Sequence, residues 1–107
     1  MTIPKHQPIV RFQQWDCAVE YATYRNTGRV AIELIDPNDE TSIAVATVNV
    51  PEAKLEPDEV IIKDYSENEG MLDALVNAGI VEPTGVQLQV GFARCPIARL
   101  LVKPGAV

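Results

Sequence analysis

Hydrophobic and polar residues alternate along much of this chain with the period of two that is typical of half-buried β-strands. The clearest example is residues 86–92, VQLQVGF, in which we expect the valines, the leucine and the phenylalanine to point inward and the two glutamines outward. Similar patterns predict further strands at residues 17–24, 29–35, 42–50, 60–63 and 97–102, with residues 9–14 as an alternative extension. The turn-forming sequences RNTG and DPND separate the first three of these strands, which indicates an antiparallel meander.

One segment has the spacing of an amphipathic helix, and we expect that helix at about residues 67–78. Its apolar residues lie in MLDALV at residues 71–76 with the spacing i, i+1, i+4 and i+5, which places them on one stripe. Gly79 follows as a predicted left-handed cap. Ile80 comes directly after it, in the position where an apolar contact usually completes a Schellman motif.

These elements predict an α+β fold with a curled, mostly antiparallel sheet of five to six strands and one packed α-helix. One helix cannot cover both faces of such a sheet, so the sheet must either curl on itself or cover its second face with loops. A chain of 107 residues has the size of one domain. We expect that domain at residues 9–103, between a mobile N-terminal segment at residues 1–8 and a short tail at residues 104–107.

The most polar stretch of the chain, DYSENEG, starts at Asp64 and directly precedes the apolar helix stripe. Ser66 and Glu69 have the S-x-x-E spacing of a capping box, in which each side chain accepts a hydrogen bond from the backbone amide of the other. Asp64 lies just before the predicted helix and adds to the same arrangement. Asn68 and Gly70 are poor helix formers. Together with Glu69 they therefore form a secondary candidate surface for binding.

The net charge of −6 is distributed unevenly, because residues 33–69 carry eleven acidic residues and only two lysines. A net negative protein does not bind nucleic acid non-specifically, since such binding neutralises phosphates, but it can attract a basic partner. Two clusters of candidate partner-binding residues flank the predicted strand at residues 42–50. They are Asp36, Asp39, Glu40, Glu52, Glu56, Asp58 and Glu59. At about 3.3 Å per residue, this strand would hold the two clusters roughly 30 Å apart.

Motifs for catalysis or for cofactor binding are absent from the sequence. It has no phosphate-binding glycine motif and no nucleophile or zinc signature, and its single histidine, His6, lies in the N-terminal segment. Cys17 and Cys95 lie in apolar runs, so we expect reduced, unreactive thiols. We therefore expect no enzymatic activity, no cofactor and no metal. No apolar run is long enough to span a bilayer, and MTIPKHQP has no signal-peptide core, which predicts a cytoplasmic protein.

Several segments resemble an uncharacterised family of small bacterial proteins. The most specific is IKDYSENEGM at residues 62–71, which is followed by AGIV at residues 78–81. GRVAIEL at residues 28–34 and TVNVP at residues 47–51 match the same family, so the resemblance spans residues 28–101. Such proteins are accessory products of plasmids, conjugative elements and phages. The resemblance therefore implies a genomic setting, and it implies no catalytic residues.

We expect a non-enzymatic protein that binds a basic surface on a host protein, as nucleic-acid mimics and anti-defence inhibitors do. The partner would contact the two acidic clusters, and the protein itself would be a monomer or a weak homodimer. The first alternative is that the acidic residues lie in ordinary solvent-exposed turns and have no binding role. The second is a homodimeric structural module that uses an exposed strand edge. The third is a small enzyme whose residues converge only in space, which would need a deep pocket with a buried ionisable group.

Overall fold

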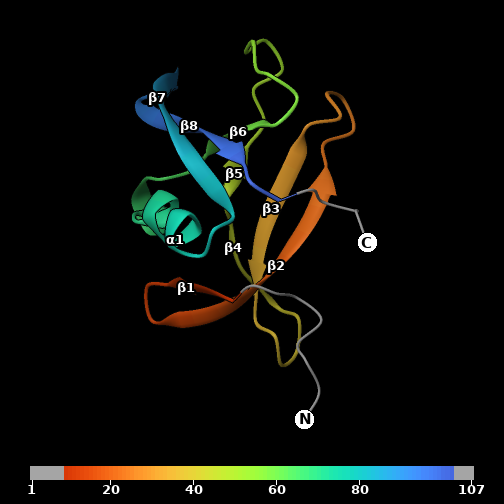
Figure 1. Ribbon diagram of the computed structural model, residues 1–107, viewed down its shortest axis with the longest axis vertical. Coiled ribbons are helices and arrows are strands. Elements are labelled where there is room, and N and C mark those ends of the chain that lie inside the picture. Colours follow the sequence, from red (N-terminus) through yellow and green to blue (C-terminus); the bar gives the residue numbers. More distant parts are fainter. Residues whose placement is uncertain (1–8, 103–107) are drawn as a thin grey trace.

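The computed structural model describes residues 9–102 (Figure 1). The segment at residues 1–8 that we expect to be mobile and the predicted tail at residues 104–107 lie outside the described residues. The strands are β1 (Val10–Phe12), β2 (Trp15–Thr23), β3 (Val30–Ile35), β4 (Ser42–Val45), β5 (Thr47–Val48), β6 (Glu59–Ile62), β7 (Val81–Val90) and β8 (Ala93–Leu100). A 3-10 helix (Ser66–Asn68) and the α-helix α1 (Met71–Asn77) lie between β6 and β7 in the chain. No helix within residues 9–102 has the length and apolar character needed to cross a membrane.

Residues 9–102 form two antiparallel sheets of four strands each, in the orders β1-β2-β3-β4 and β5-β6-β8-β7. The predicted α+β class with one packed helix is confirmed, but two sheets replace the expected single sheet of five to six strands. The division falls at the buried Ala46, inside the predicted strand 42–50. The Ala46 amide donates to the carbonyl of Ile32 on β3, and its carbonyl accepts from the amide of Lys63 beside β6, both at 2.8 Å. The chain therefore passes from one sheet to the other at this residue.

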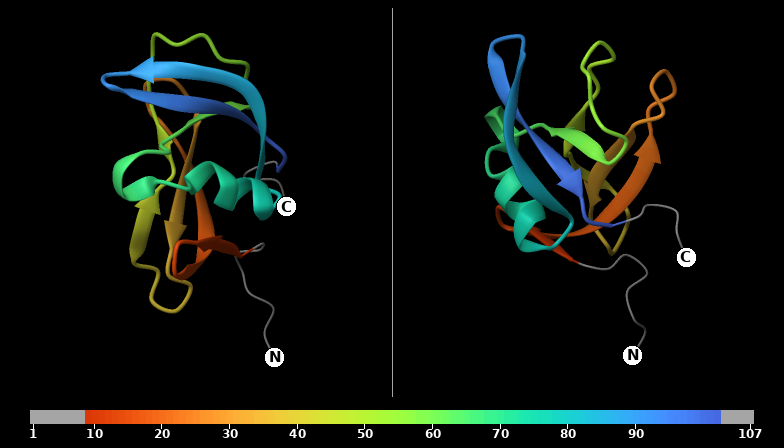
Figure 2. Two further views of the ribbon diagram at one scale, coloured as in Figure 1. Left: turned by 90° about the vertical axis from the view of Figure 1, so that its left-hand side faces the viewer. Right: turned by 45° about the horizontal axis from the view of Figure 1, so that its top comes forward.

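The main core lies where the two sheets and α1 meet. β1 contacts α1 on one side and β7 contacts it on the other, as Figure 2 shows. The largest fully buried side chains of this core are Ile32, Leu34, Ile62, Met71, Leu75 and Ile80. Full burial of one such side chain stabilises the folded state by about 1.5–3 kcal/mol. Strands and helix thus depend on one shared apolar interior.

A second, smaller core covers the other face of the second sheet. Its buried members are Ile61, Cys95 and Ile97. Tyr65 and the apolar side chains of residues 48–55 pack against them. Of the two expected alternatives, a sheet that curls on itself or a second face covered by loops, this face of the second sheet shows the covering by loops.

The β7–β8 hairpin differs from the strand predicted at residues 86–92. β7 ends before Gly91, which has a φ of +60° and begins a two-residue turn, the position that glycine occupies in type II′ turns. Phe92 is the second residue of the turn and is fully exposed instead of pointing inward. Val86 is also 55% exposed, and it lies within residues 83–87, where the register between β7 and β8 shifts. The hairpin therefore presents apolar side chains to solvent.

The C-terminal end of α1 matches the predicted Schellman motif. Gly79 has a φ of +76°, and its amide donates to the carbonyl of Val76 at 3.0 Å. The amide of Ile80 donates to the carbonyl of Leu75, also at 3.0 Å, and the Ile80 side chain is fully buried. These two bonds satisfy carbonyls that the helix end would otherwise leave without a partner.

Candidate functional site

The turn between β3 and β4 holds the first acidic cluster, and we call residues 36–40 the acidic turn. The carboxylate of Asp36 accepts from the amide of Asn38 at 2.8 Å. The carboxylate of Asp39 accepts from the Thr41 amide at 3.1 Å and from the Thr41 hydroxyl at 2.8 Å, and these bonds lower its pKa. The Glu40 amide closes the turn by donating to the Asp36 carbonyl at 2.8 Å. The donors that fix these carboxylates are neutral, so they hold the geometry of the acidic turn without cancelling its charge.

The second acidic cluster lies in residues 49–59, which we call the acidic loop. Arg29 donates hydrogen bonds to the carbonyls of Val50, at 2.7 Å, and of Ala53. The side chain of Asn49 forms hydrogen bonds with two side chains of the turn between β2 and β3. These contacts hold the loop over the second core. The sequence pattern did not indicate that the side chain of Arg29 would hold the acidic loop in place.

Basic side chains also offset the charge of the acidic loop. Arg99 on β8 pairs with Asp58 at 3.2 Å and lies 3.9 Å from a carboxylate oxygen of Glu59 and 3.8 Å from one of Glu82. The Glu59 carboxylate also accepts from the amide of Glu56 at 2.9 Å. Three cations, which are Arg29, Lys54 and Arg99, thus lie in or against this loop.

The two acidic clusters therefore differ in their electrostatics. They lie at opposite ends of the molecule in Figure 1, the acidic turn at the bottom and the acidic loop at the top, along an axis of 44 Å. The expected placement at opposite ends is confirmed, although the strand between them is broken at Ala46. Among the ion pairs within residues 9–102, none includes Asp36, Asp39 or Glu40. The acidic turn is thus in no ion pair within residues 9–102, whereas Arg99 pairs with Asp58 and Glu59 of the acidic loop; Glu52 and Glu56 are in no ion pair there either.

The predicted capping box of Ser66 and Glu69 is wrong. α1 begins only at Met71, after Gly70 in a left-handed conformation with a φ of +94°. The carboxylate of Asp64 accepts hydrogen bonds from the amides of Gly70 at 2.7 Å and Met71 at 3.2 Å. Asp64 therefore supplies the acceptor that the capping box assigned to the Ser66 hydroxyl, and the predicted helix at residues 67–78 is shortened.

Asn68 explains why the helix starts late. Its side chain is only 3% exposed, and its amide group donates to the carbonyl of Val45 on β4 at 2.7 Å. This bond anchors the 3-10 turn to the first sheet, so the chain has to turn again at Gly70 before α1 can start. The secondary candidate surface is corrected accordingly. Asn68 is buried and the Gly70 amide is bonded to Asp64, which leaves only the Glu69 side chain exposed.

Both cysteines are free and fully buried, as predicted. Cys17 lies in the main core and Cys95 in the second core, so they belong to different packing clusters. Burial raises the pKa of Cys17 to about 11, with smaller contributions from the nearby carboxylates of Asp16 and Asp36. Burial likewise raises the pKa of the Cys95 thiol. Neither thiol is poised to act as a nucleophile.

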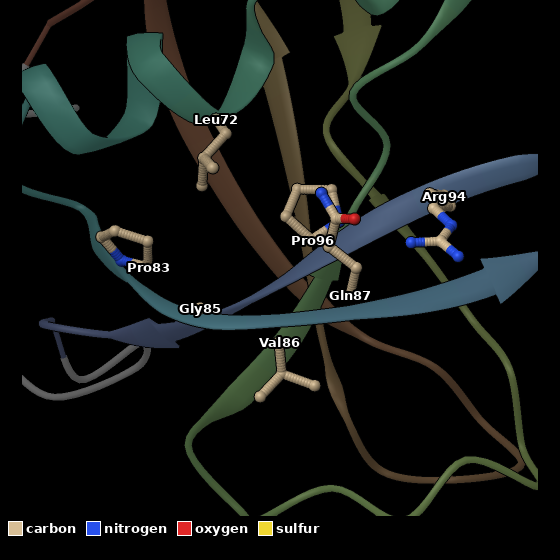
Figure 3. A pocket seen from close by; sticks show the side chains of 7 residues that line it. All are labelled: Leu72, Pro83, Gly85, Val86, Gln87, Arg94 and Pro96. Carbon is tan, nitrogen blue, oxygen red and sulfur yellow. The ribbon is translucent and has the colours of Figure 1, made fainter.

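Two open cavities lie beside the β7–β8 hairpin. The first has a volume of about 360 Å³ and lies between the hairpin and α1 (Figure 3). Its lining residues are Leu72, Pro83, Gly85, Val86, Gln87, Arg94 and Pro96. The second, of about 500 Å³, is lined by Tyr65, Ser66, Val90, Phe92 and Ala93. Neither of these two cavities contains a buried ionisable side chain. A third, of about 170 Å³, is lined by Glu20, Tyr21 and Glu33 among others, and burial raises the pKa of Tyr21.

Comparisons of the chain with protein-family models, with curated proteins and with solved structures gave no match. The resemblance carried by IKDYSENEGM and AGIV therefore stays a prediction.

Proposed function

We propose that this protein is a non-enzymatic accessory protein of a mobile genetic element that binds a host protein. The bound surface of the host protein is basic, as expected for an anti-defence or nucleic-acid-mimic module. The observation that carries this proposal is the acidic turn, whose carboxylates have no cationic partner among residues 9–102. The sequence resemblance supports the genomic setting, and the acidic turn supports the chemistry of the partner.

The acidic turn suits electrostatic recognition for two reasons. Its tip is exposed, so its charges reach a partner before other surfaces come into contact, and such charges raise association rates more than they raise affinity. Hydrogen bonds already hold the carboxylates of Asp36 and Asp39 in place, so little conformational freedom is lost on binding. The partner's contribution would be arginine and lysine side chains of a nucleic-acid-binding groove.

The test uses substitutions that remove charge and preserve shape. The turn variant combines Asp36→Asn, Asp39→Asn and Glu40→Gln, because asparagine keeps a side-chain oxygen that can accept the bonds from Asn38 and Thr41. The control variant removes the same amount of charge from the acidic loop. It combines Glu52→Gln, Glu56→Gln and Asp58→Asn. Both variants should unfold at urea concentrations close to that of the wild-type protein.

The partner is first captured from host lysate at low salt and identified by mass spectrometry. Its association with each variant is then measured by surface plasmon resonance. The turn variant should associate at least about tenfold more slowly than the wild-type protein, within the range that electrostatic steering supplies. The loop variant should change the rate less, because Arg29, Lys54 and Arg99 lie in or against the acidic loop and lower its net negative charge. If both variants bind as fast as the wild-type protein, and binding persists at high salt, the acidic turn is only a solvated surface.

A further inference from the structure

The β7–β8 hairpin has a free edge. Within residues 9–102, β7 pairs with β8 on one side and with no strand on the other. Pro96 on β8 lies opposite Gln87 and has no N–H, so these two residues cannot exchange the reciprocal bonds of a hydrogen-bonded pair. The backbone N–H and C=O of Gln87 therefore face away from β8. By the alternation of an antiparallel ladder, those of Gln89 do the same.

The outer half of this edge lacks the features that usually prevent strand pairing. Residues 86–90, VQLQV, contain no charge and no proline. The inner half differs, because it carries Glu82, Pro83 and the shift in register within residues 83–87. Natural edge strands use charges, prolines and bulges to discourage pairing with another chain. The segment 86–90 is thus an open edge next to a protected one.

This open edge is complementary to itself. VQLQV reads the same in both directions, and the partner strand in an antiparallel pair runs in reverse. A two-fold axis at Leu88 would place Gln87 opposite Gln89 of the second copy and Leu88 opposite its own counterpart. The backbone groups of Gln87 and Gln89 that face outward would then meet and form about four hydrogen bonds across the axis. Two-fold dimers require such a patch, in which one surface fits itself.

The side chains fit the same arrangement. Val86 and Gln87 point to opposite sides of β7, with Gln87 on the side of Pro96 (Figure 3). Pairing about Leu88 would bring the Val86, Leu88 and Val90 side chains of both copies into one apolar row. It would also place the turn that carries the fully exposed Phe92 beside the bulge of the second copy. Exposed apolar surface on this hairpin would become buried.

We propose that two copies of this protein pair through the β7 edge, forming a two-fold dimer with one continuous eight-stranded sheet. The interface comprises about five residues per strand and the turn, which is smaller than the roughly 1,200 Å² of standard stable interfaces. The dimer is therefore weak and forms reversibly with rising concentration. This inference does not depend on the proposed function, because the acidic turn lies in the other sheet.

The test is sedimentation equilibrium of the full chain from low to high micromolar concentration, where the wild-type protein should associate to a dimer and no further. Two double variants probe the register. Gln87→Lys with Gln89→Lys places like charges opposite each other twice, whereas Gln87→Lys with Gln89→Glu places opposite charges there. The first should dimerise about 30-fold more weakly than the second, equivalent to about 2 kcal/mol.

A third variant, Gln89→Pro, covers the case in which the charged variants fold poorly. It removes an N–H that faces the free edge and leaves the β8 ladder intact, so the protein should fold normally and remain monomeric. Circular dichroism and the unfolding midpoint report folding in each case. A wild-type protein that stays monomeric at every concentration overturns the proposal. Equal dimerisation of the two charged variants, or an unimpaired Gln89→Pro dimer, also overturns it.

Discussion

Replacement of Asp64 by alanine should destabilise the protein at the start of α1. Asp64 accepts hydrogen bonds from the amides of Gly70 and Met71, and both donors would lose their acceptor. Loss of a helix cap costs about 0.5–2 kcal/mol, and loss of a negative charge at the positive end of a helix adds about 0.3–1 kcal/mol. α1 has only seven residues and cannot be stable alone, yet it brings Met71 and Leu75 into the main core. We expect a total loss of about 2 kcal/mol.

Two further substitutions separate the contributions. Asp64→Asn keeps an oxygen acceptor and removes the charge, so it should cost roughly half as much as Asp64→Ala. Ser66→Ala removes a hydroxyl that caps no helix in the described structure, so it should change the free energy of unfolding by less than about 0.5 kcal/mol. Urea unfolding followed by far-ultraviolet circular dichroism measures all three, with the slope m as a check on the two-state assumption.

The midpoint of thermal unfolding, Tm, gives an independent measure of the stability of each variant. For a domain of this size a change of 1 kcal/mol shifts Tm by about 4–8 °C, so Asp64→Ala should lower it by about 10 °C. The order of stability should be wild type, then Ser66→Ala, then Asp64→Asn, then Asp64→Ala. If Ser66→Ala is as destabilising as Asp64→Ala, the capping box operates in solution and our account of the helix start is refuted.

Three other predictions concern the two cysteines and Arg29. Because the pKa of Cys17 is raised from 9.0 to about 11, the unfolded chain loses this thiol proton at lower pH than the folded protein does, so stability should fall between pH 9 and 11. Urea midpoints measured across this window should show a smaller decline for Cys17→Ala than for the wild-type protein, and an equal decline would contradict the assignment. Neither Cys17 nor Cys95 should react with a thiol reagent before unfolding, whereas rapid labelling would mean that a core opens readily. Arg29→Ala should cost about 2 kcal/mol and speed amide exchange in the acidic loop, and unchanged exchange there would show that Arg29 does not hold it.

The sequence alone determined the features that depend on neighbouring residues. The turn after β3 follows from DPND, because the Asp36 side chain bonds to an amide only two residues away. The end of α1 follows from Gly79 and Ile80, whose amides bond to carbonyls three and five residues earlier. Alternating apolar residues likewise predicted most strands and the burial of both cysteines. Such features are readable because the chain brings their partners together wherever the segment lies.

The tertiary structure decided everything that joins distant segments. The bond from Asn68 to Val45 spans 23 residues and sets where α1 can begin, and the bond from Arg29 to Val50 spans 21 and fastens the acidic loop. Arg99 pairs with Asp58 of the acidic loop, 41 residues earlier in the chain, whereas the acidic turn is in no ion pair within residues 9–102. Ala46 divides a strand that reads as continuous, because its amide and carbonyl bond to different sheets. A polar side chain or backbone group could form a hydrogen bond or ion pair with many chemically equivalent groups along the chain. Only packing of the two sheets around one core selects among them.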